Sequence, residues 1–114
     1  MTPEGFRRLA LSLPETVEAA HVGHPDFRVG GKIFATLGDP DLSWGVVKLT
    51  PADQDMRLAE ATIFVPAAGA WGRRGWTKVK LKLADETTLR SALLAAWRNV
   101  APKRLARQMD ARKK

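Results

Sequence analysis

Residues 26–37 read DFRVGGKIFATL and carry the clearest β-hairpin signal in this chain of 114 residues. Gly30 and Gly31 separate two short segments that are rich in β-branched and aromatic residues. Because both glycines can adopt the positive φ of a two-residue hairpin turn, the segment predicts a strand, a tight turn and a second strand. A further apolar run at 44–49 follows turn residues 38–41, so we expect an antiparallel meander of three strands.

Helix signals lie on both sides of this meander. Thr2-Pro3 and Thr50-Pro51 each combine a capping residue with a proline suited to the first helical position, and Asp85 can cap a later helix. The expected helices span about residues 3–13, 51–60, 85–101 and 103–112. Residues 15–24 have no clear period and are expected to form a connection. A short strand is expected near residues 63–65, and a turn at 72–75.

The segment 76–83 alternates between apolar and cationic positions. One predicted face carries Thr77, Val79, Leu81 and Leu83. The other carries Trp76, Lys78, Lys80 and Lys82. Since neighbouring side chains of a strand point to opposite faces, we expect a strand with one buried and one cationic face.

The element order is therefore α-β-β-β-α-β-β-α-α. Strands grouped by hairpin connections, with helices between the groups, favour an α+β fold, a two-layer α/β sandwich in which helices cover one face of an antiparallel sheet. The length suits a single domain over residues 1–114. Trp44 and Trp97 are expected in its core, because each occupies a strand or helix position that faces apolar neighbours.

Composition excludes several classes of protein. Hydrophobic residues make up 45% of the chain, too many for a disordered protein, and no apolar run is long enough to cross a bilayer. The first fifteen residues lack the apolar core of a secretory signal, and the absence of cysteine excludes disulfides and thiolate chemistry. We therefore expect a soluble, cytoplasmic protein with no membrane association.

The net charge of +7 is concentrated in two segments. Residues 71–82 contain five bases and no acid, and residues 98–114 contain seven bases and one acid, whereas the remaining residues carry −4. A mildly acidic body with two basic segments suggests an anionic partner. A solvated helix face or a tail that aids solubility is the alternative explanation for the C-terminal segment.

Enzymatic chemistry has little support. His21 and His24 have carboxylates nearby at Glu18 and Asp26, a spacing suited to a metal ion on a helix, but the intervening glycine and proline disfavour a helix. No nucleophile elbow or Walker-type glycine loop is present. We expect no catalytic residue, no cofactor and no metal, with a small-molecule or metal site around His21, His24 and Trp44 as the weaker alternative.

The cationic strand points to nucleic acid. Lys78, Lys80 and Lys82 would lie about 6.5 to 7 Å apart, comparable to the spacing of phosphates along one strand. Arg73 and Arg74 in the preceding turn can clamp a further phosphate or enter a groove, and Trp71 or Trp76 can stack on an exposed base. Alternatively, an outward row of lysines prevents an edge strand from pairing with another chain.

Five segments carry a resemblance to a known family. They are 12–15 (SLPE), 24–35 (HPDFRVGGKIFA), 47–49 (VKL), 72–76 (GRRGW) and 96–105 (AWRNVAPKRL). In these segments, and in their order along the chain, the sequence resembles the MmcQ/YjbR family of small bacterial proteins. The resemblance implies a two-layer fold similar to secretion chaperones and CyaY-like proteins, and DNA binding through a double-wing arrangement. One wing would be the hairpin at 26–37, and the second would be the turn at 72–75 with the strand that follows.

We therefore expect a non-catalytic DNA-binding protein that contacts phosphates with little sequence specificity. Its expected contacts are Arg73, Arg74, Trp76, Lys78, Lys80 and Lys82, with Lys103, Arg104 and Arg107 as a second patch. The alternative is a protein-interaction module of chaperone-like fold that binds an acidic protein partner, with the apolar stretch 63–71 as the contact or as a homodimer interface. The sequence leaves monomer and homodimer open.

Overall fold

The computed structural model describes residues 1–38, 41–60 and 62–112. The strands are β1 (Val17–His21), β2 (His24–Val29), β3 (Lys32–Leu37), β4 (Trp44–Lys48), β5 (Phe64–Pro66) and β6 (Trp76–Lys80). The helices are α1 (Pro3–Leu11), α2 (Pro51–Arg57), α3 (Gly69–Arg73), α4 (Glu86–Val100) and α5 (Lys103–Arg112), and a 3-10 turn at Leu58–Glu60 follows α2.

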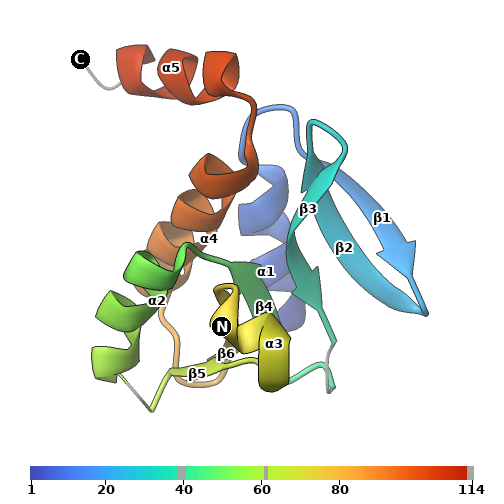
Figure 1. Ribbon diagram of the computed structural model, residues 1–114. Helices are drawn as coiled ribbons and strands as arrows, with labels where there is room; N and C mark the ends of the chain where they lie inside the picture. The colour runs from blue at the N-terminus through green and yellow to red at the C-terminus, as the bar shows by residue number, and fades with distance from the viewer. Residues whose placement is uncertain (39–40, 61, 113–114) are drawn as a thin grey trace.

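The six strands form one antiparallel sheet in the order β1-β2-β3-β4-β6-β5. Helices α1 and α4 lie behind this sheet in Figure 1, and the short helix α3 lies in front of it. The predicted α+β fold, with an antiparallel sheet covered by helices, is confirmed. Within the described ranges, no helix is both long enough and apolar enough to cross a membrane.

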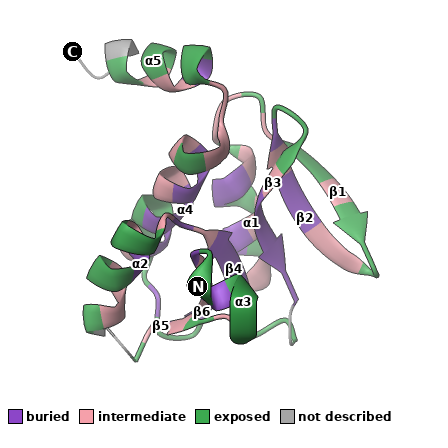
Figure 2. Cartoon of the chain, viewed as in Figure 1, coloured by how far each residue is buried: buried purple, intermediate pink, exposed green. Residues whose placement is uncertain are grey.

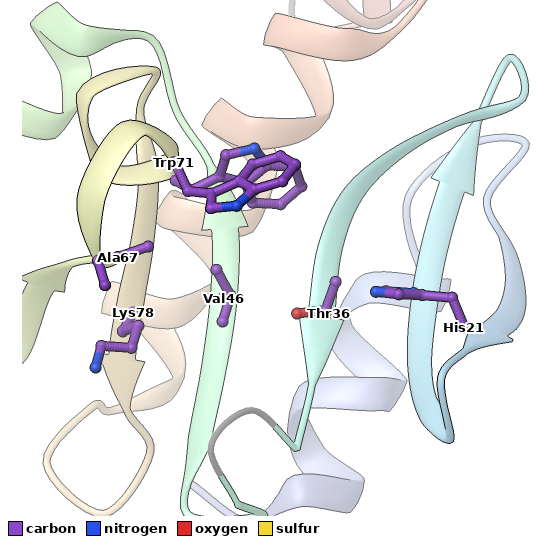
Figure 3. Close-up of a pocket in the computed structure, with 8 residues that line it drawn as sticks. His21, Thr36, Val46, Ala67, Trp71 and Lys78 are labelled. Atoms are coloured by element: carbon purple, nitrogen blue, oxygen red, sulfur yellow. The ribbon is translucent and has the colours of Figure 1, made fainter.

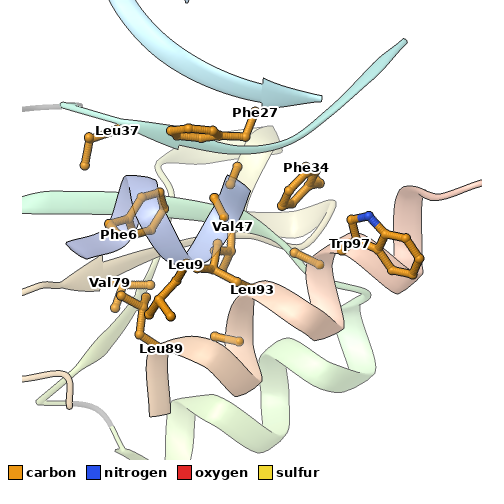
Figure 4. Close-up of a cluster of buried hydrophobic side chains, with 14 of the residues drawn as sticks. Phe6, Leu9, Phe27, Phe34, Leu37, Val47, Val79, Leu89, Leu93 and Trp97 are labelled. Atoms are coloured by element: carbon orange, nitrogen blue, oxygen red, sulfur yellow. The ribbon is translucent and has the colours of Figure 1, made fainter. Parts of the chain in front are cut away.

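The core lies between the sheet and the two long helices. Figure 4 shows Phe6 and Leu9 of α1 and Leu93 of α4 packing toward Val47 on the sheet. Trp97 is fully buried, as predicted, and its indole Nε1 donates a hydrogen bond of 3.0 Å to the carbonyl oxygen of Pro14. This hydrogen bond satisfies the polar end of a side chain whose rings pack in the core.

The predicted hairpin is confirmed as β2 and β3, joined by Gly30 and Gly31. Both glycines have positive φ angles, 60° and 79°, as the tight turn requires. The ring of Pro102, which precedes α5, packs against this turn, because a Cβ at Gly30 would lie 2.9 Å from the Pro102 Cγ. The start of α5 is therefore beside the hairpin turn.

Two elements, β1 and α3, were not predicted from the sequence. The expected connection at 15–24 contains β1, an edge strand whose side chains are mostly exposed, as Figure 2 shows. Exposure on both faces removes the alternation by which a half-buried strand is recognised. The first half of the turn predicted at 72–75 belongs to the short helix α3, which the glycines of this segment disfavour by propensity, and only residues 74–75 form the turn.

The strand predicted over 76–83 is too long. β6 ends at Lys80, and a turn follows in which the amide of Leu83 donates to the Lys80 carbonyl over 3.1 Å. Leu83 is consequently 54% exposed and not part of the buried face, and Lys82 lies in the turn, outside the lysine row. β6 pairs with both β4 and β5, so the edge-strand explanation for its lysines is also wrong.

One glycine determines how closely α1 approaches the sheet. Gly45 of β4 lies beneath the ring of Phe6, and a Cβ at this position would lie 2.4 Å from the Phe6 Cε2. Phe6 is fully buried and its ring centroid is 5.9 Å from that of Phe27. The ring therefore has little room to move away from a larger residue at position 45.

We predict that Gly45→Ala lowers the free energy of unfolding by about 1–3 kcal/mol, because the new methyl overlaps the Phe6 ring. In a Phe6→Leu background the same substitution is expected to cost roughly half as much or less, since the smaller side chain leaves room. Urea denaturation of the four proteins measures both costs. Equal costs in the two backgrounds would show that the Phe6 contact does not constrain position 45.

Candidate nucleic-acid interface

On the face of the sheet opposite α1 and α4, alternate residues of β4 and β6 are half-buried, except for Val46, which is buried. The register pairs Trp44 with Lys80, Val46 with Lys78, and Lys48 with Trp76. The intervening residues Gly45, Val47, Thr77 and Val79 are buried on the helix side. We call the surface formed by Trp44, Val46, Lys48, Trp76, Lys78 and Lys80 the open face. It places two tryptophans and three lysines on adjacent strands.

The lysines of the open face lie against its tryptophans. The Nζ atoms of Lys78 and Lys80 are 4.9 and 5.7 Å from the ring centroid of Trp44, and the Nζ of Lys48 is 5.7 Å from that of Trp76. At these distances the negative ring face attracts the ammonium group, while the lysine stem covers part of the ring. Trp44 is half-buried on this face, so the prediction that it lies in the core is wrong.

A hollow of about 430 Å³ lies on this face; we call it the tryptophan hollow. Its lining residues are His21, Thr36, Val46, Ala67, Ala68, Trp71, Trp76 and Lys78. Trp71 of α3 and Trp76 meet edge to face, with ring centroids 6.3 Å apart and planes at 74°. Figure 3 shows Trp71 at one end of the hollow and the His21 side chain pointing toward Thr36 at the other.

His21 is held by a buried carboxylate. Asp26 is fully buried and accepts hydrogen bonds from Arg28 Nε at 2.8 Å, Arg28 Nη2 at 3.0 Å and His21 Nδ1 at 2.8 Å. The hydrogen bond from Arg28 holds the pKa of Asp26 below its ordinary value, against the opposing effect of burial. Because the ionised carboxylate can only accept, His21 donates through Nδ1, and its Nε2 remains available for another hydrogen bond.

A second hollow, of about 560 Å³, adjoins the first and shares Trp76 with it. Four bases from four segments line it: Arg28, Lys32, Lys48 and Arg74. No acidic residue is among the described residues that line either hollow. We call the second one the basic hollow, since it continues the positive charge of the open face toward the hairpin turn.

Hydrogen bonds from a buried glutamine hold the segment that carries Arg73 and Arg74. Gln54 of α2 is buried, and its Nε2 donates to the Gly72 carbonyl at 2.9 Å, with the Trp76 carbonyl and Thr77 Oγ1 at 3.2 and 3.1 Å. Both arginines are exposed, and the guanidinium carbon of Arg74 lies 5.9 Å from the Trp71 ring centroid. Arg74 thus lies between the two hollows.

Comparison with known proteins identifies the family. The family model named YjbR matches residues 11–99, most of the chain. The chain belongs to the YjbR family. Among solved structures, the crystal structure of Deinococcus radiodurans protein DR2400, with a DUF419 domain, aligns with a TM-score of 0.71 at 18% identity, covering 86% of this chain and 77% of that one. No curated protein matches the sequence.

Some of the residues predicted as contacts come together on this YjbR fold. Trp76, Lys78 and Lys80 lie on the open face, and Arg74 joins them at the basic hollow. Arg73 is exposed at the end of α3. Lys82 does not belong to this group, because the strand ends before it.

The second predicted patch lies on α5, outside the residues that match the family model. Lys103, Arg104 and Arg107 are exposed, and Figure 1 shows α5 at one end of the molecule. Arg104 Nη1 lies 3.6 Å from a carboxylate oxygen of Glu15, which partly neutralises its charge. Through the Pro102 contact with the hairpin turn, the patch begins near the basic hollow.

Three bases of the interface were not predicted from the sequence: Arg28, Lys32 and Lys48. Each stands alone in its segment, so a search for runs of charge does not find it. The alternation in β4, where Trp44 and Lys48 flank Val46, is the available signal. This alternation places Trp44 and Lys48 on one face of β4, but the pairing of β4 with β6 is needed to bring them next to Lys78 and Lys80.

The two histidines are not arranged as the metal alternative requires. His21 and His24 are partners at the tight turn between β1 and β2, where Val22 and Gly23 have φ angles of 49° and 78°, so they do not share a helix face. Among the described residues, no group of three or more histidines, cysteines, aspartates or glutamates is placed to share an ion.

We predict that Asp26→Asn lowers the free energy of unfolding by about 1–3 kcal/mol at pH 7, because Arg28 and His21 lose their anionic acceptor. The pKa of Asp26 is lower in the folded protein than in the unfolded chain, where it is about 3.9. The ionised carboxylate therefore stabilises the fold at pH values above about 3.9, and this stabilisation is lost as the pH falls through the pKa of the folded protein. The difference in the free energy of unfolding between wild type and variant, measured by urea denaturation, is therefore expected to become smaller below about pH 4.

The matched control for this prediction is Asp55→Asn, which removes an exposed carboxylate on α2. It is expected to change stability by less than about 0.5 kcal/mol. A gap for Asp26→Asn that stays constant down to about pH 3 would contradict a role for the ionised carboxylate.

Proposed function

We propose that this protein binds DNA without catalysis, mainly through phosphate contacts and with little sequence specificity. The observation that carries the proposal is the open face, where three lysines on two adjacent strands surround two tryptophans. Positive charge gathered on one face raises the local potential toward a polyanion.

The bases are spaced to follow a phosphate backbone. Lys78 and Lys80 alternate along β6 and lie about 6.5 to 7 Å apart, and Lys48 is on the neighbouring strand. Arg74 and Lys32 extend the charge into the basic hollow. Phosphate contacts of this kind position a protein on DNA without reading its bases, which is why we propose little specificity.

The neighbouring carboxylate does not cancel this charge. Asp26 is buried and already accepts hydrogen bonds from Arg28 and His21. The lysines of the open face have no salt-bridge partner among the described residues. Their ammonium groups remain available to an external anion, held in place by the indole rings beneath them.

An acidic protein partner is the second candidate, and it draws on the same bases. Its apolar contact was expected along 63–71, where Phe64 is buried in the core and Trp71 is 60% exposed. A protein interface of standard size is commonly organised around an exposed aromatic side chain of this kind. Competition with heparin separates the two candidates. If the basic surface recognises only negative charge, heparin displaces DNA from it and no preference for DNA is seen.

We predict that Lys78→Glu combined with Lys80→Glu flattens the salt dependence of DNA binding. If about five phosphates are neutralised, the logarithm of affinity falls against the logarithm of salt with a slope of roughly −4 to −5. Loss of two contacts is expected to change this slope to about −3. Fluorescence anisotropy of a labelled duplex between about 50 and 200 mM salt measures it.

The matched control is Arg8→Glu combined with Arg90→Glu, which changes the net charge equally on exposed positions of α1 and α4. These helices cover the opposite face of the sheet, so the slope is expected to stay near that of the wild type. A double lysine variant with the wild-type slope would remove β6 from the interface. Equal effects of the two double variants would mean that only the total charge matters.

A further inference from the structure

The tryptophan hollow has walls that do not suit a phosphate. Val46, Ala67, Trp71 and Trp76 present apolar surface, yet the hollow lies within a cationic face. A phosphate group in contact with such walls would lose hydration without gaining hydrogen bonds from them. A flat ring loses little by the same transfer and gains dispersion contacts. The volume of about 430 Å³ falls in the range of small-ligand sites, so one ring system with its substituents fits it.

The polar groups of the hollow suit the edge of a nucleobase. His21 presents Nε2 for a hydrogen bond, because its Nδ1 is engaged by Asp26. Thr36 also lines the hollow, with a hydroxyl that can donate or accept. Figure 3 shows His21 and Thr36 reaching the hollow from two different strands, with the indole of Trp71 at its other end. Nucleobases carry both donors and acceptors on their edges.

Resting on the proposed function, we propose that the DNA bound by the open face is single-stranded, with one unstacked base in the tryptophan hollow and its backbone along Lys78, Lys80 and Lys48. Bases of a duplex are stacked on one another, so an indole lying in a hollow cannot reach their faces. A single strand can turn its bases toward the protein, and base–aromatic stacking tolerates any sequence.

A second stacking position lies along the same strand pair. Trp44 and Trp76 occupy opposite ends of the β4–β6 ladder, because Trp44 pairs with Lys80 and Trp76 with Lys48. Four strand residues separate their positions, which corresponds to about 13 Å along the sheet. Antiparallel sheets that bind single-stranded nucleic acid use aromatic residues on adjacent β-strands in the same way. Each aromatic ring stacks on one nucleobase, and neighbouring lysines or arginines contact the phosphates.

The test compares labelled oligothymidine of about 20 nucleotides with a duplex of equal length, by fluorescence anisotropy near 100 mM salt. The single strand is expected to bind about tenfold or more tightly than the duplex. Trp71→Ala and Trp44→Ala are each expected to weaken single-strand binding about 5- to 140-fold. For Trp71→Ala, duplex binding should change by less than about twofold and the salt slope should match the wild type, since no phosphate contact is removed.

Trp71 is 60% exposed, so its replacement leaves the core intact and keeps the test valid if Trp44→Ala is unstable. Met56→Ala, at a residue 75% exposed on α2 and outside both hollows, is the matched control and should bind like the wild type.

Three results would overturn the inference, and they separate it from the proposed function. Duplex binding as tight as single-strand binding, still dependent on Lys78 and Lys80, would leave DNA binding standing and reject the single strand. Tight single-strand binding with an unchanged affinity in Trp71→Ala would reject the hollow as a base site. Failure to bind either probe would reject both proposals.

Discussion

The antiparallel register between β4 and β6 is the constraint on which the rest of the structure depends. It directs Gly45, Val47, Thr77 and Val79 toward the helices and leaves the tryptophans and lysines of both strands on the opposite side. Because side chains alternate along a strand, a slip of one residue would bury lysines and expose the core in a single step. The burial of the apolar set therefore fixes the position of every charged group on the open face.

The two faces of the sheet have separate roles. The helix side supplies stability through close packing, in which Gly45 admits the ring of Phe6 and Trp97 closes the far end of the core. The open face is not covered by the long helices, so its side chains carry charge and aromatic surface. Its organisation comes instead from buried polar groups, Asp26 beneath His21 and Gln54 beneath the arginine turn. These groups hold the open face in one arrangement, which would reduce the entropy lost in the proposed binding.

The sequence was sufficient for elements whose signal is local. The glycine pair at 30–31, the capped helices and the alternation of β6 through Lys80 are of this kind. The predictions that were wrong concern elements whose position depends on contacts with residues distant in sequence. The strand β1 is held by pairing with β2 and not by its own burial, and the position of Trp44 depends on which face α1 covers. The basic hollow draws single charges from four segments, so only the pairing of strands reveals it.

The arginine pair of α3 and its turn stands between two glycines that cannot be replaced. A Cβ at Gly72 would lie 2.0 Å from the Ala67 carbonyl oxygen, and one at Gly75 would lie 1.9 Å from that of Leu49. Gly75 also has a φ of 105°. Arg73 and Arg74 themselves are exposed and contribute nothing to the core. The two arginine positions can therefore take other side chains without altering the fold, whereas a side chain at either glycine would collide with backbone.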